Sequence, residues 1–346
     1  MSLNEIIKEF LLEKGAIKVG FANKETLAGG PPSIDLDYRL EGAKSAISFA
    51  LPMNRDHIRL FLAKKDRSPH ENDNIATNLK CRDLSWELAT MLKSEGHLSK
   101  GCAANQKYRQ EVENWQLYLH PDLSHRYMAA RSGVGSFGWS GNVGIKDFGT
   151  AIMLGTAVTV AELEPTDPEP EEEQFCDQCK MCVSACPTDM FDLKKEDSVT
   201  LGGKEFKYAF RNEILRCNLC CGGITGLSTS GKWSTWSPGR YELPWEQEKL
   251  IDVAINASQG YNKRPPIPGG YVNVVNNART YMTCGNCQIV CWGNKKETSE
   301  NVKILHNSGC VIQNPDGEIR VYPAEEAAEK FEQLPVDHQV HYRQLN

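Results

Sequence analysis

Four cysteines in "FCDQCKMCVSACPTDMF", residues 175–191, have a spacing that can bind iron. Their pattern is Cys-x2-Cys-x2-Cys-x3-Cys followed by proline, formed by Cys176, Cys179, Cys182 and Cys186. In bacterial ferredoxin runs of this form, three cysteines hold one [4Fe–4S] cluster and the fourth ligates another. The run therefore predicts a second set of ligands elsewhere in the chain.

A second motif, "CGNCQIVCW", supplies three more cysteines, Cys284, Cys287 and Cys291. Two [4Fe–4S] clusters need eight thiolates, and the two motifs provide seven. The segment "RCNLCCGG" between them offers Cys217, Cys220 or Cys221 as the eighth ligand, and Cys217 is preferred. Cross-ligation predicts one cluster on Cys176, Cys179, Cys182 and Cys291, and the other on Cys186, Cys217, Cys284 and Cys287.

The alternative for paired Cys-x2-Cys units is tetrahedral zinc, but three closely spaced cysteines and a fourth before proline favour iron–sulfur clusters. The 13 cysteines could also indicate a disulfide framework. A long chain whose N-terminus shows no secretion signal argues instead for reduced thiols. Cys81, Cys102 and Cys310 stand alone in the sequence and are expected to be buried or incidental thiols.

The stretch "GVGSFG", residues 133–138, satisfies the dinucleotide-binding pattern G-x-G-x-x-G. That function requires a strand before the pattern and a helix after it. The preceding "DLSHRYMAARS" has helical periodicity instead, so Gly133 is expected to cap the C-terminus of a helix. The pattern therefore does not indicate a nucleotide site.

The elements that must position these motifs alternate between helix and strand. Residues 3–15 and 81–96 have apolar residues at helical spacing and end on glycine, whereas 16–22 and 45–52 are short β-branched and aromatic runs. This alternation predicts an α/β or α+β fold. Residues 161–174, "AELEPTDPEPEEEQ", are acidic and proline-rich and predict an exposed linker, and "CVIQNPDGEIRVYP" at 310–323 predicts a hairpin.

Together, "AARSGVGSFGWSGNVGI", the acidic connection and the cysteine motifs resemble the cobalamin-dependent epoxyqueuosine reductases and reductive dehalogenases. "LEGAKSAISFALPMN" is similar to a strand of that family. The resemblance implies a nitroreductase-like cobalamin-binding core over 1–160, a double [4Fe–4S] ferredoxin-like domain over 161–295, and a C-terminal tail over 296–346 that packs on the core. It also implies base-off cobalamin, contacted by Arg131, Gly133, Gly135, Gly138 and Asn142.

The sequence departs from this family where epoxyqueuosine reductases have a proton-donating aspartate. The corresponding segment is "YLHPD", with Leu119 at the aspartate position. Candidate proton donors nearby are His120, Asp122 and Tyr108, with Tyr127 a further tyrosine. Asp122 has a competing structural interpretation, which is preferred, as the N-cap of the helix that follows. Trp233, Trp236 and Trp245 could line a substrate pocket or cover the clusters.

Composition limits the partners. A net charge of −6 and a pI of about 5.8 give no footprint for nucleic acid, so tRNA is the less favoured substrate. The expected protein is cytoplasmic, without a membrane segment, and takes electrons from a low-potential donor such as ferredoxin or flavodoxin. The expected function is a cobalamin and iron–sulfur reductase that cleaves a carbon–heteroatom bond in a small molecule. The alternatives are epoxyqueuosine reduction in tRNA and an electron-transfer protein without cobalamin.

Overall fold

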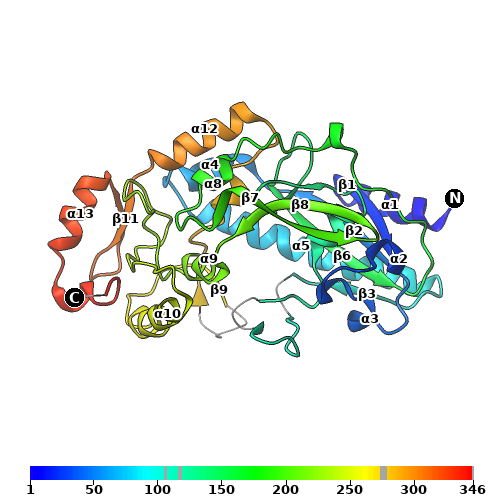
Figure 1. Ribbon diagram of the computed structural model, residues 1–346, viewed down its shortest axis with the longest axis horizontal. Coiled ribbons are helices and arrows are strands. Elements are labelled where there is room, and N and C mark those ends of the chain that lie inside the picture. Colours follow the sequence, from blue (N-terminus) through cyan, green and yellow to red (C-terminus); the bar gives the residue numbers. More distant parts are fainter. Residues whose placement is uncertain (105–106, 116–118, 273–278, 345–346) are drawn as a thin grey trace.

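A four-stranded antiparallel sheet lies in the half of the molecule that carries the N-terminus, in a computed structural model that describes residues 1–104, 107–115, 119–272 and 279–344 (Figure 1). Its four strands have the order β1-β2-β6-β3. They are β1 (Lys18–Asn23), β2 (Ser45–Pro52), β6 (Ile152–Thr159) and β3 (Ser99–Cys102). β2 is buried along nearly its whole length, because helices cover both faces of the sheet.

The two faces of β2 differ in side-chain size. Its large residues, Ile47, Phe49 and Leu51, pack in one cluster with α1 (Leu3–Glu13) and α5 (Ser68–Ser94). The small residues Ala46 and Ala50 face the other side, where α7 (His125–Arg131) packs. This alternation follows from the two-residue period of a strand. The small face lets the helix that precedes the glycine run lie close to the sheet.

The local predictions for the first half of the chain are confirmed at these elements. The runs at 16–22 and 45–52 are strands β1 and β2, and the first helix ends before Gly15, which has φ +97°. The helix expected over 81–96 begins earlier, at Ser68, with a proline in its first turn. Proline is tolerated there because the first helical N–H groups have no intrahelical partner. The mixed α/β class is confirmed, while the division into domains stays a prediction.

The acidic segment 161–174 is more closely attached than an exposed linker would be. Ala161 and Leu163 are buried in the sheet core. Two hydrogen bonds join Thr166 to Phe21. The Thr166 N–H donates to the Phe21 carbonyl at 2.9 Å, and the Phe21 N–H donates to the Thr166 side-chain Oγ1 at 2.9 Å. The prediction was wrong for these residues because it weighed composition alone.

A long hairpin, β7 (Phe191–Leu201) and β8 (Lys204–Arg211), follows the first cysteine motif. It extends from the cysteine region to α2 (Lys24–Leu27), where the Gly202 N–H donates to the Ala28 carbonyl at 2.8 Å (Figure 1). The hairpin thus ties the cysteine-rich half of the chain to the sheet domain.

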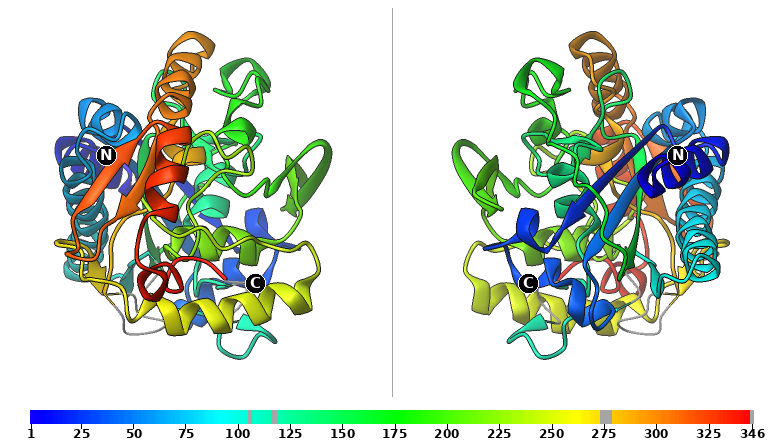
Figure 2. Two further views of the ribbon diagram at one scale, coloured as in Figure 1. Left: turned by 90° about the vertical axis from the view of Figure 1, so that its left-hand side faces the viewer. Right: turned by 90° about the vertical axis from the view of Figure 1, so that its right-hand side faces the viewer.

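The remaining elements are short or lie in the second half. The helices are α3 (Leu36–Arg39), α4 (Arg55–Leu62), α8 (Met181–Ser184), α9 (Ile214–Cys221), α10 (Gln247–Tyr261), α11 (Asn286–Ile289), α12 (Lys295–His306), α13 (Ala324–Glu332) and α14 (Val336–Gln339). The strands are β4 (Ser136–Phe137), β5 (Val143–Gly144), β9 (Tyr271–Val272), β10 (Arg279–Thr280), β11 (Cys310–Gln313) and β12 (Ile319–Tyr322). β11 and β12 form the hairpin predicted over 310–323. α12 and α10 lie at opposite edges of the molecule in both side views (Figure 2).

One apolar cluster joins the halves of the chain. It brings Met53 and Phe61 together with Trp233, Trp236 and residues of α12 and β11. Trp236 donates its indole N–H to the Phe61 carbonyl at 3.0 Å, so these two tryptophans belong to the core rather than to an open pocket. Trp245 is exposed and stacks on the Arg216 guanidinium, 3.8 Å from the ring centroid. Within the described ranges, the chain forms no helix both long and apolar enough to span a bilayer.

Candidate functional site

Four thiols from both cysteine motifs meet at one cavity. Cys176 and Cys179 lie in the loop before α8, Cys182 lies on α8, and Cys291 follows α11. All four line the same cavity. Burial, together with the neighbouring thiols Cys176, Cys291 and Cys179, raises the pKa of Cys182 to about 12. The chain therefore gathers here the four cysteines that cross-ligation assigns to one cluster.

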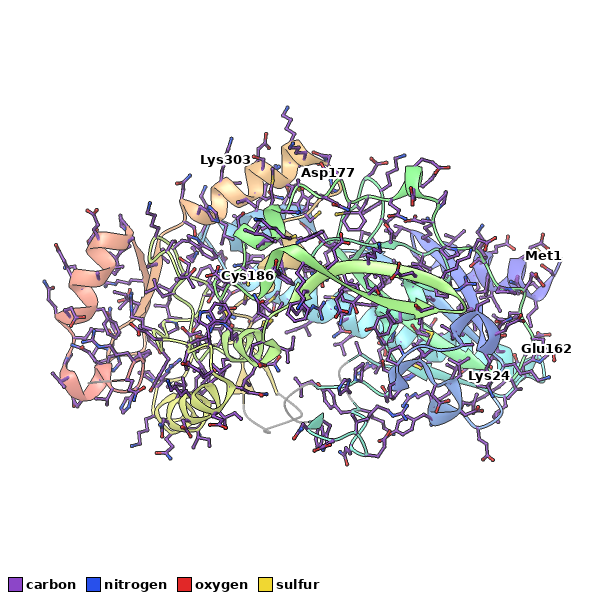
Figure 3. All side chains as sticks on the ribbon, viewed as in Figure 1. Met1, Lys24, Glu162, Asp177, Cys186 and Lys303 are labelled. Atoms are coloured by element: carbon purple, nitrogen blue, oxygen red, sulfur yellow. The ribbon has the colours of Figure 1, made fainter. Side chains whose placement is uncertain are left out.

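A second group of thiols forms where α9 meets α11. Burial raises the pKa of Cys287 well above its ordinary value, and Cys217, Cys284 and Cys186 add to that rise. Figure 3 shows Cys186 toward the interior of the view, whereas Asp177 of the first loop lies near the surface. The four residues proposed for the other cluster thus also lie near one another.

The eighth ligand remains open between three cysteines of α9. The Sγ atoms of Cys217 and Cys221 are 3.8 Å apart. Hydrogen bonds with Cys220 and Cys221 lower the pKa of Cys284. All three α9 cysteines therefore lie close to the second group, and the preference for Cys217 stays a prediction.

The described residues contain no group of three or more His, Cys, Asp or Glu side chains arranged around a single metal ion. A four-iron cluster occupies the space between its thiolates and so holds them apart. The donor sets fit such clusters in chemistry, because each consists of four cysteines and soft thiolates are the ligands iron–sulfur clusters use.

The glycine run follows a helix, as expected. α7 ends at Arg131, and Gly133 takes φ +70° just after the Ser132 C-cap, which confirms the predicted capping role. A Cβ atom on Gly133 would lie 2.2 Å from the Asp167 carbonyl oxygen, and one on Gly135 would lie 2.4 Å from the Gly144 carbonyl oxygen. Close packing against the chain itself therefore explains these glycines without a ligand.

Gly138 has the same kind of environment, since a Cβ there would lie 2.7 Å from the Phe175 ring. Beside it, a cavity of about 560 Å³ lies between the glycine run, the acidic segment and the β7–β8 hairpin. Its walls include Trp139, Phe206 and Tyr208. Arg131, the remaining residue predicted near the cofactor on this helix, is buried and donates to the Thr166 carbonyl at 3.4 Å.

The loop that follows the glycine run touches a thiol of each group. The Trp139 backbone N–H donates to Cys176 Sγ at 3.4 Å. The Asn142 side-chain amide donates to Cys287 Sγ at 3.5 Å. Hydrogen bonds to the sulfurs are one of the factors that set the potential of an iron–sulfur cluster. This single loop therefore donates a hydrogen bond to a thiol of each group.

Two arginines that the sequence analysis did not single out hold this loop. Arg126 donates to the Gly141 carbonyl at 2.9 Å, and Arg211 donates to the Ser140 carbonyl at 3.2 Å. Burial and the neighbouring Arg211 lower the pKa of Arg126 to about 10. Tyr127 and Tyr208 share a hydrogen bond beside them, and burial is the main cause that raises the pKa of Tyr208. In the sequence, the only feature that could have drawn attention to these arginines is that Arg126 stands next to the candidate proton donor Tyr127.

Three of the predicted proton donors, Tyr108, His120 and Asp122, lie before α7, and the fourth, Tyr127, lies in it. Tyr108 forms a β-bridge with Pro121, and the Arg109 N–H donates to the His120 carbonyl at 2.8 Å. Asp122 is buried and forms an ion pair with Arg39 at 3.0 Å. Burial raises the pKa of Asp122, although Arg39 opposes that rise.

The preferred structural interpretation of Asp122 is wrong. Ser124 is the N-cap of α7, and its side chain accepts from the Tyr127 N–H at 3.5 Å. Asp122 lies two residues earlier, where its carboxylate accepts from the Leu123 N–H at 2.9 Å and pairs with Arg39. Both Asp and Ser favour N-caps, and the sequence could not show which of them begins the helix.

Comparison with known proteins gives partial matches to one kind of reductase. No family model matches the chain. An epoxyqueuosine reductase from Bacillus anthracis is 26% identical over 192 residues, which cover 52% of this chain and 47% of that protein. One from Synechocystis is 35% identical over 85 residues, which cover 21% of this chain and 28% of that protein. Over these parts, the chain is similar to proteins named epoxyqueuosine reductase.

The matches to these reductases are partial, since the chain spans about half the length of the Bacillus anthracis protein and less of the Synechocystis protein. Among solved structures, an epoxyqueuosine reductase from Bacillus subtilis has a TM-score of 0.44 at 18% identity and covers 85% of this chain and 66% of that chain. A catabolic reductive dehalogenase has a TM-score of 0.47 at 14% identity and covers 63% of this chain and 29% of that chain.

Proposed function

We propose that this chain is an iron–sulfur oxidoreductase that uses cobalamin to cleave a carbon–heteroatom bond reductively. The observation that supports it most is the gathering of the seven motif cysteines, with the cysteines of α9, into two groups joined by one loop. The relationship to proteins named epoxyqueuosine reductase adds to it.

Each thiol group would hold one [4Fe–4S] cluster. The Cys176 group would accept electrons from a low-potential donor such as ferredoxin or flavodoxin, since its loop includes exposed residues such as Asp177. The Cys186 group would receive them next. Trp139 and Asn142 would hold the two clusters on one rigid loop, so the distance between them would stay fixed.

Bound cobalamin would supply the low-valent cobalt that attacks the scissile bond, and the difficult chemistry belongs to that cofactor. The groups on the chain that suit it are Asn142, Arg126, Tyr127, Tyr208 and Arg211, beside the second thiol group. The fit rests on Arg211, whose buried Nε has no hydrogen-bond partner, because cobalamin carries a phosphodiester. The chain would bind and orient the cofactor there and exclude water.

A side chain must also deliver a proton to the product. A general acid has to come within hydrogen-bond reach of the reacting atom. Tyr127 is the favoured donor because its hydroxyl lies in the polar set beside the second thiol group. Asp122 is less suited while it pairs with Arg39, although its raised pKa favours a protonated form.

Two substrate classes follow from this site. A small molecule is the first, because Leu119 stands where epoxyqueuosine reductases have their acid and because the chain is acidic overall. Epoxyqueuosine in tRNA is the second, and the names of the curated relatives favour it.

The test is anaerobic turnover with cobalamin and a chemical reductant. A brominated hydroxybenzoate and an epoxyqueuosine-bearing tRNA stem loop would be offered separately. Halide release supports the first class, and queuosine formation supports the second. Protein that takes up flavin, ignores cobalamin and turns over neither substrate would be an electron-transfer protein instead.

A further inference from the structure

Arg126 and Arg211 approach the same loop from two different elements. Arg126 lies near the start of α7, and Arg211 is the last residue of β8. Each donates to a neighbouring backbone carbonyl, Gly141 and Ser140 respectively. Burial lowers the pKa of Arg126, and the nearby charge of Arg211 adds to that shift. Two positive charges are therefore held together by the fold.

Among the described residues, no carboxylate forms an ion pair with either arginine. The buried Arg131 and Arg216 also lack such a partner, whereas Arg39 and Arg67 have one. Those two pair with Asp122 at 3.0 Å and Glu71 at 2.5 Å. Arg211 Nε is buried and lacks a hydrogen-bond partner, as do Arg39 Nε and Arg131 Nε. Buried charges are normally paired, and a buried donor without a partner is costly. The pair therefore has unsatisfied charge and an unused donor.

The groups around the pair also donate hydrogen bonds. Tyr127 and Tyr208 bring two hydroxyls. Tyr208 lies 5.8 Å, ring centroid to guanidinium carbon, from Arg211 and also lines the cavity of about 560 Å³. Cluster thiolates at Cys217 and Cys287 would offset part of the positive charge. A cluster alone does not account for the hydroxyls or for Arg211 Nε.

We infer that Arg126 and Arg211 form an oxyanion-binding site that takes the carboxylate or phosphate group of a small molecule beside the second thiol group. Paired guanidinium groups suit such anions because they offer planar, charge-assisted donors. The inference rests on the proposed function, because that function supplies the molecules that could carry the anion. Within it, the anion belongs either to the substrate or to the phosphodiester of bound cobalamin.

The test is calorimetric binding of inorganic phosphate and of benzoate to the full chain, reconstituted without oxygen so that both clusters are present. Replacing Arg211→Gln or Arg126→Gln should weaken binding at least about tenfold, as expected for loss of a hydrogen bond to a charged group. Arg211→Lys should weaken it less, because the charge remains. Arg320→Gln is the control. Arg320 is an exposed arginine that pairs with Glu318, and both are far in the sequence from Arg126 and Arg211.

A competition assay identifies the source of the anion. If cobalamin displaces phosphate and cobinamide, which lacks the phosphodiester, does not, the site holds the cofactor. If neither displaces phosphate and benzoate does, the site holds an anionic substrate. Iron content is measured for each of the three arginine variants. A variant that has lost its iron is treated as misfolded, and the other two variants then test the inference.

The inference is overturned if the wild-type protein binds neither phosphate nor benzoate and takes up cobalamin and cobinamide equally well. It is also overturned if both glutamine variants keep their iron and bind phosphate as the wild type does. Binding is measured without turnover. An absence of reductase activity would therefore refute the proposed function while leaving the oxyanion site intact.

Discussion

The two thiol groups share a ligand chemistry but differ in the charges around them. The loop of the first group includes the exposed carboxylate Asp177, and Glu171 lines the cavity that Cys176 also lines. The second group has Arg126 and Arg211 beside it and accepts a hydrogen bond from Asn142. Positive charge favours the reduced, more negative state of a cluster. Under the proposed function, this contrast favours electron transfer from the first group to the second.

The largest expected effect is a loss of iron when a cysteine of either thiol group is replaced. Replacing Cys182→Ser should remove the first cluster, and replacing Cys287→Ser should remove the second. Iron should fall from about eight to about four per chain in either variant, because each cluster needs four thiolates. Metal and sulfide analysis of anaerobic protein measures this.

The control for that comparison is Cys81→Ala, a buried thiol in the sheet core outside both groups. It should keep its full iron content. Equal iron in Cys182→Ser and wild type would show that the grouping is mistaken.

The next prediction concerns Glu71, whose replacement should destabilise the fold near the second thiol group and not near the first. Glu71 accepts from the backbone N–H groups of Gly270, at 3.2 Å, and Met282, at 2.6 Å, and pairs with Arg67 at 2.5 Å. Met282 is two residues before Cys284. Replacing Glu71→Gln should cost about 3–5 kcal/mol of unfolding free energy, as for breaking a buried pair.

Chemical denaturation and iron analysis test the Glu71 variant together. The matched control is Glu87→Gln, whose partner Lys14 is exposed and which should cost about 0–1 kcal/mol. If Glu71→Gln lost the first cluster and kept the second, the assignment of Cys284 to the second group would be in error.

Acidification should lower the free energy of unfolding through His70, which is buried in the core. Burial lowers the pKa of His70 to about 4, and both its ring nitrogens lack a partner. Because the folded pKa is below the ordinary value of about 6.5, the unfolded chain binds a proton first and stability falls as pH drops below about 6.5. Between pH 7 and pH 5 this should cost the wild type about 2 kcal/mol.

Replacing His70→Leu should remove that part of the acid sensitivity. Urea unfolding at the two pH values gives the comparison. An unchanged pH dependence would mean that His70 is protonated in the folded protein as readily as in the unfolded chain.

The smallest expected effect is a loss of folding stability that does not distinguish the two thiol groups. Replacing Gly133→Ala places a Cβ where φ is +70° and the Asp167 carbonyl oxygen is 2.2 Å away. We expect a loss of at least about 1–2 kcal/mol from the left-handed backbone alone. Thermal unfolding measures it. A normally stable variant would show that the run can move away from the acidic segment.

The sequence predicted what depends on short-range patterns. The strand at 45–52 alternates large and small residues, and the glycine at 133 follows a helical period, so both were found. The cysteine spacing predicted that the two motifs come together, whereas the choice of Cys217 as the eighth ligand stays a prediction. These features need only the local period or the ligand chemistry.

Other features depend on distant partners that spacing does not encode. The hairpin β7–β8 pairs polar, exposed strands without strong alternation, so it gave little signal. Arg126 and Arg211 are 85 positions apart in the sequence and become neighbours only through the fold. Glu71 likewise fixes a segment about 200 residues away.

The most direct test of the account is the optical spectrum of anaerobic, iron-reconstituted protein mixed with one equivalent of cobalamin. The account predicts stoichiometric uptake with a base-off spectrum, and reduction of cobalt by a low-potential donor in the wild type. It predicts that Cys287→Ser, lacking the second cluster, no longer supports that reduction. Cobalamin that stays base-on and unbound while the protein holds about eight irons would contradict the account and leave an electron-transfer protein.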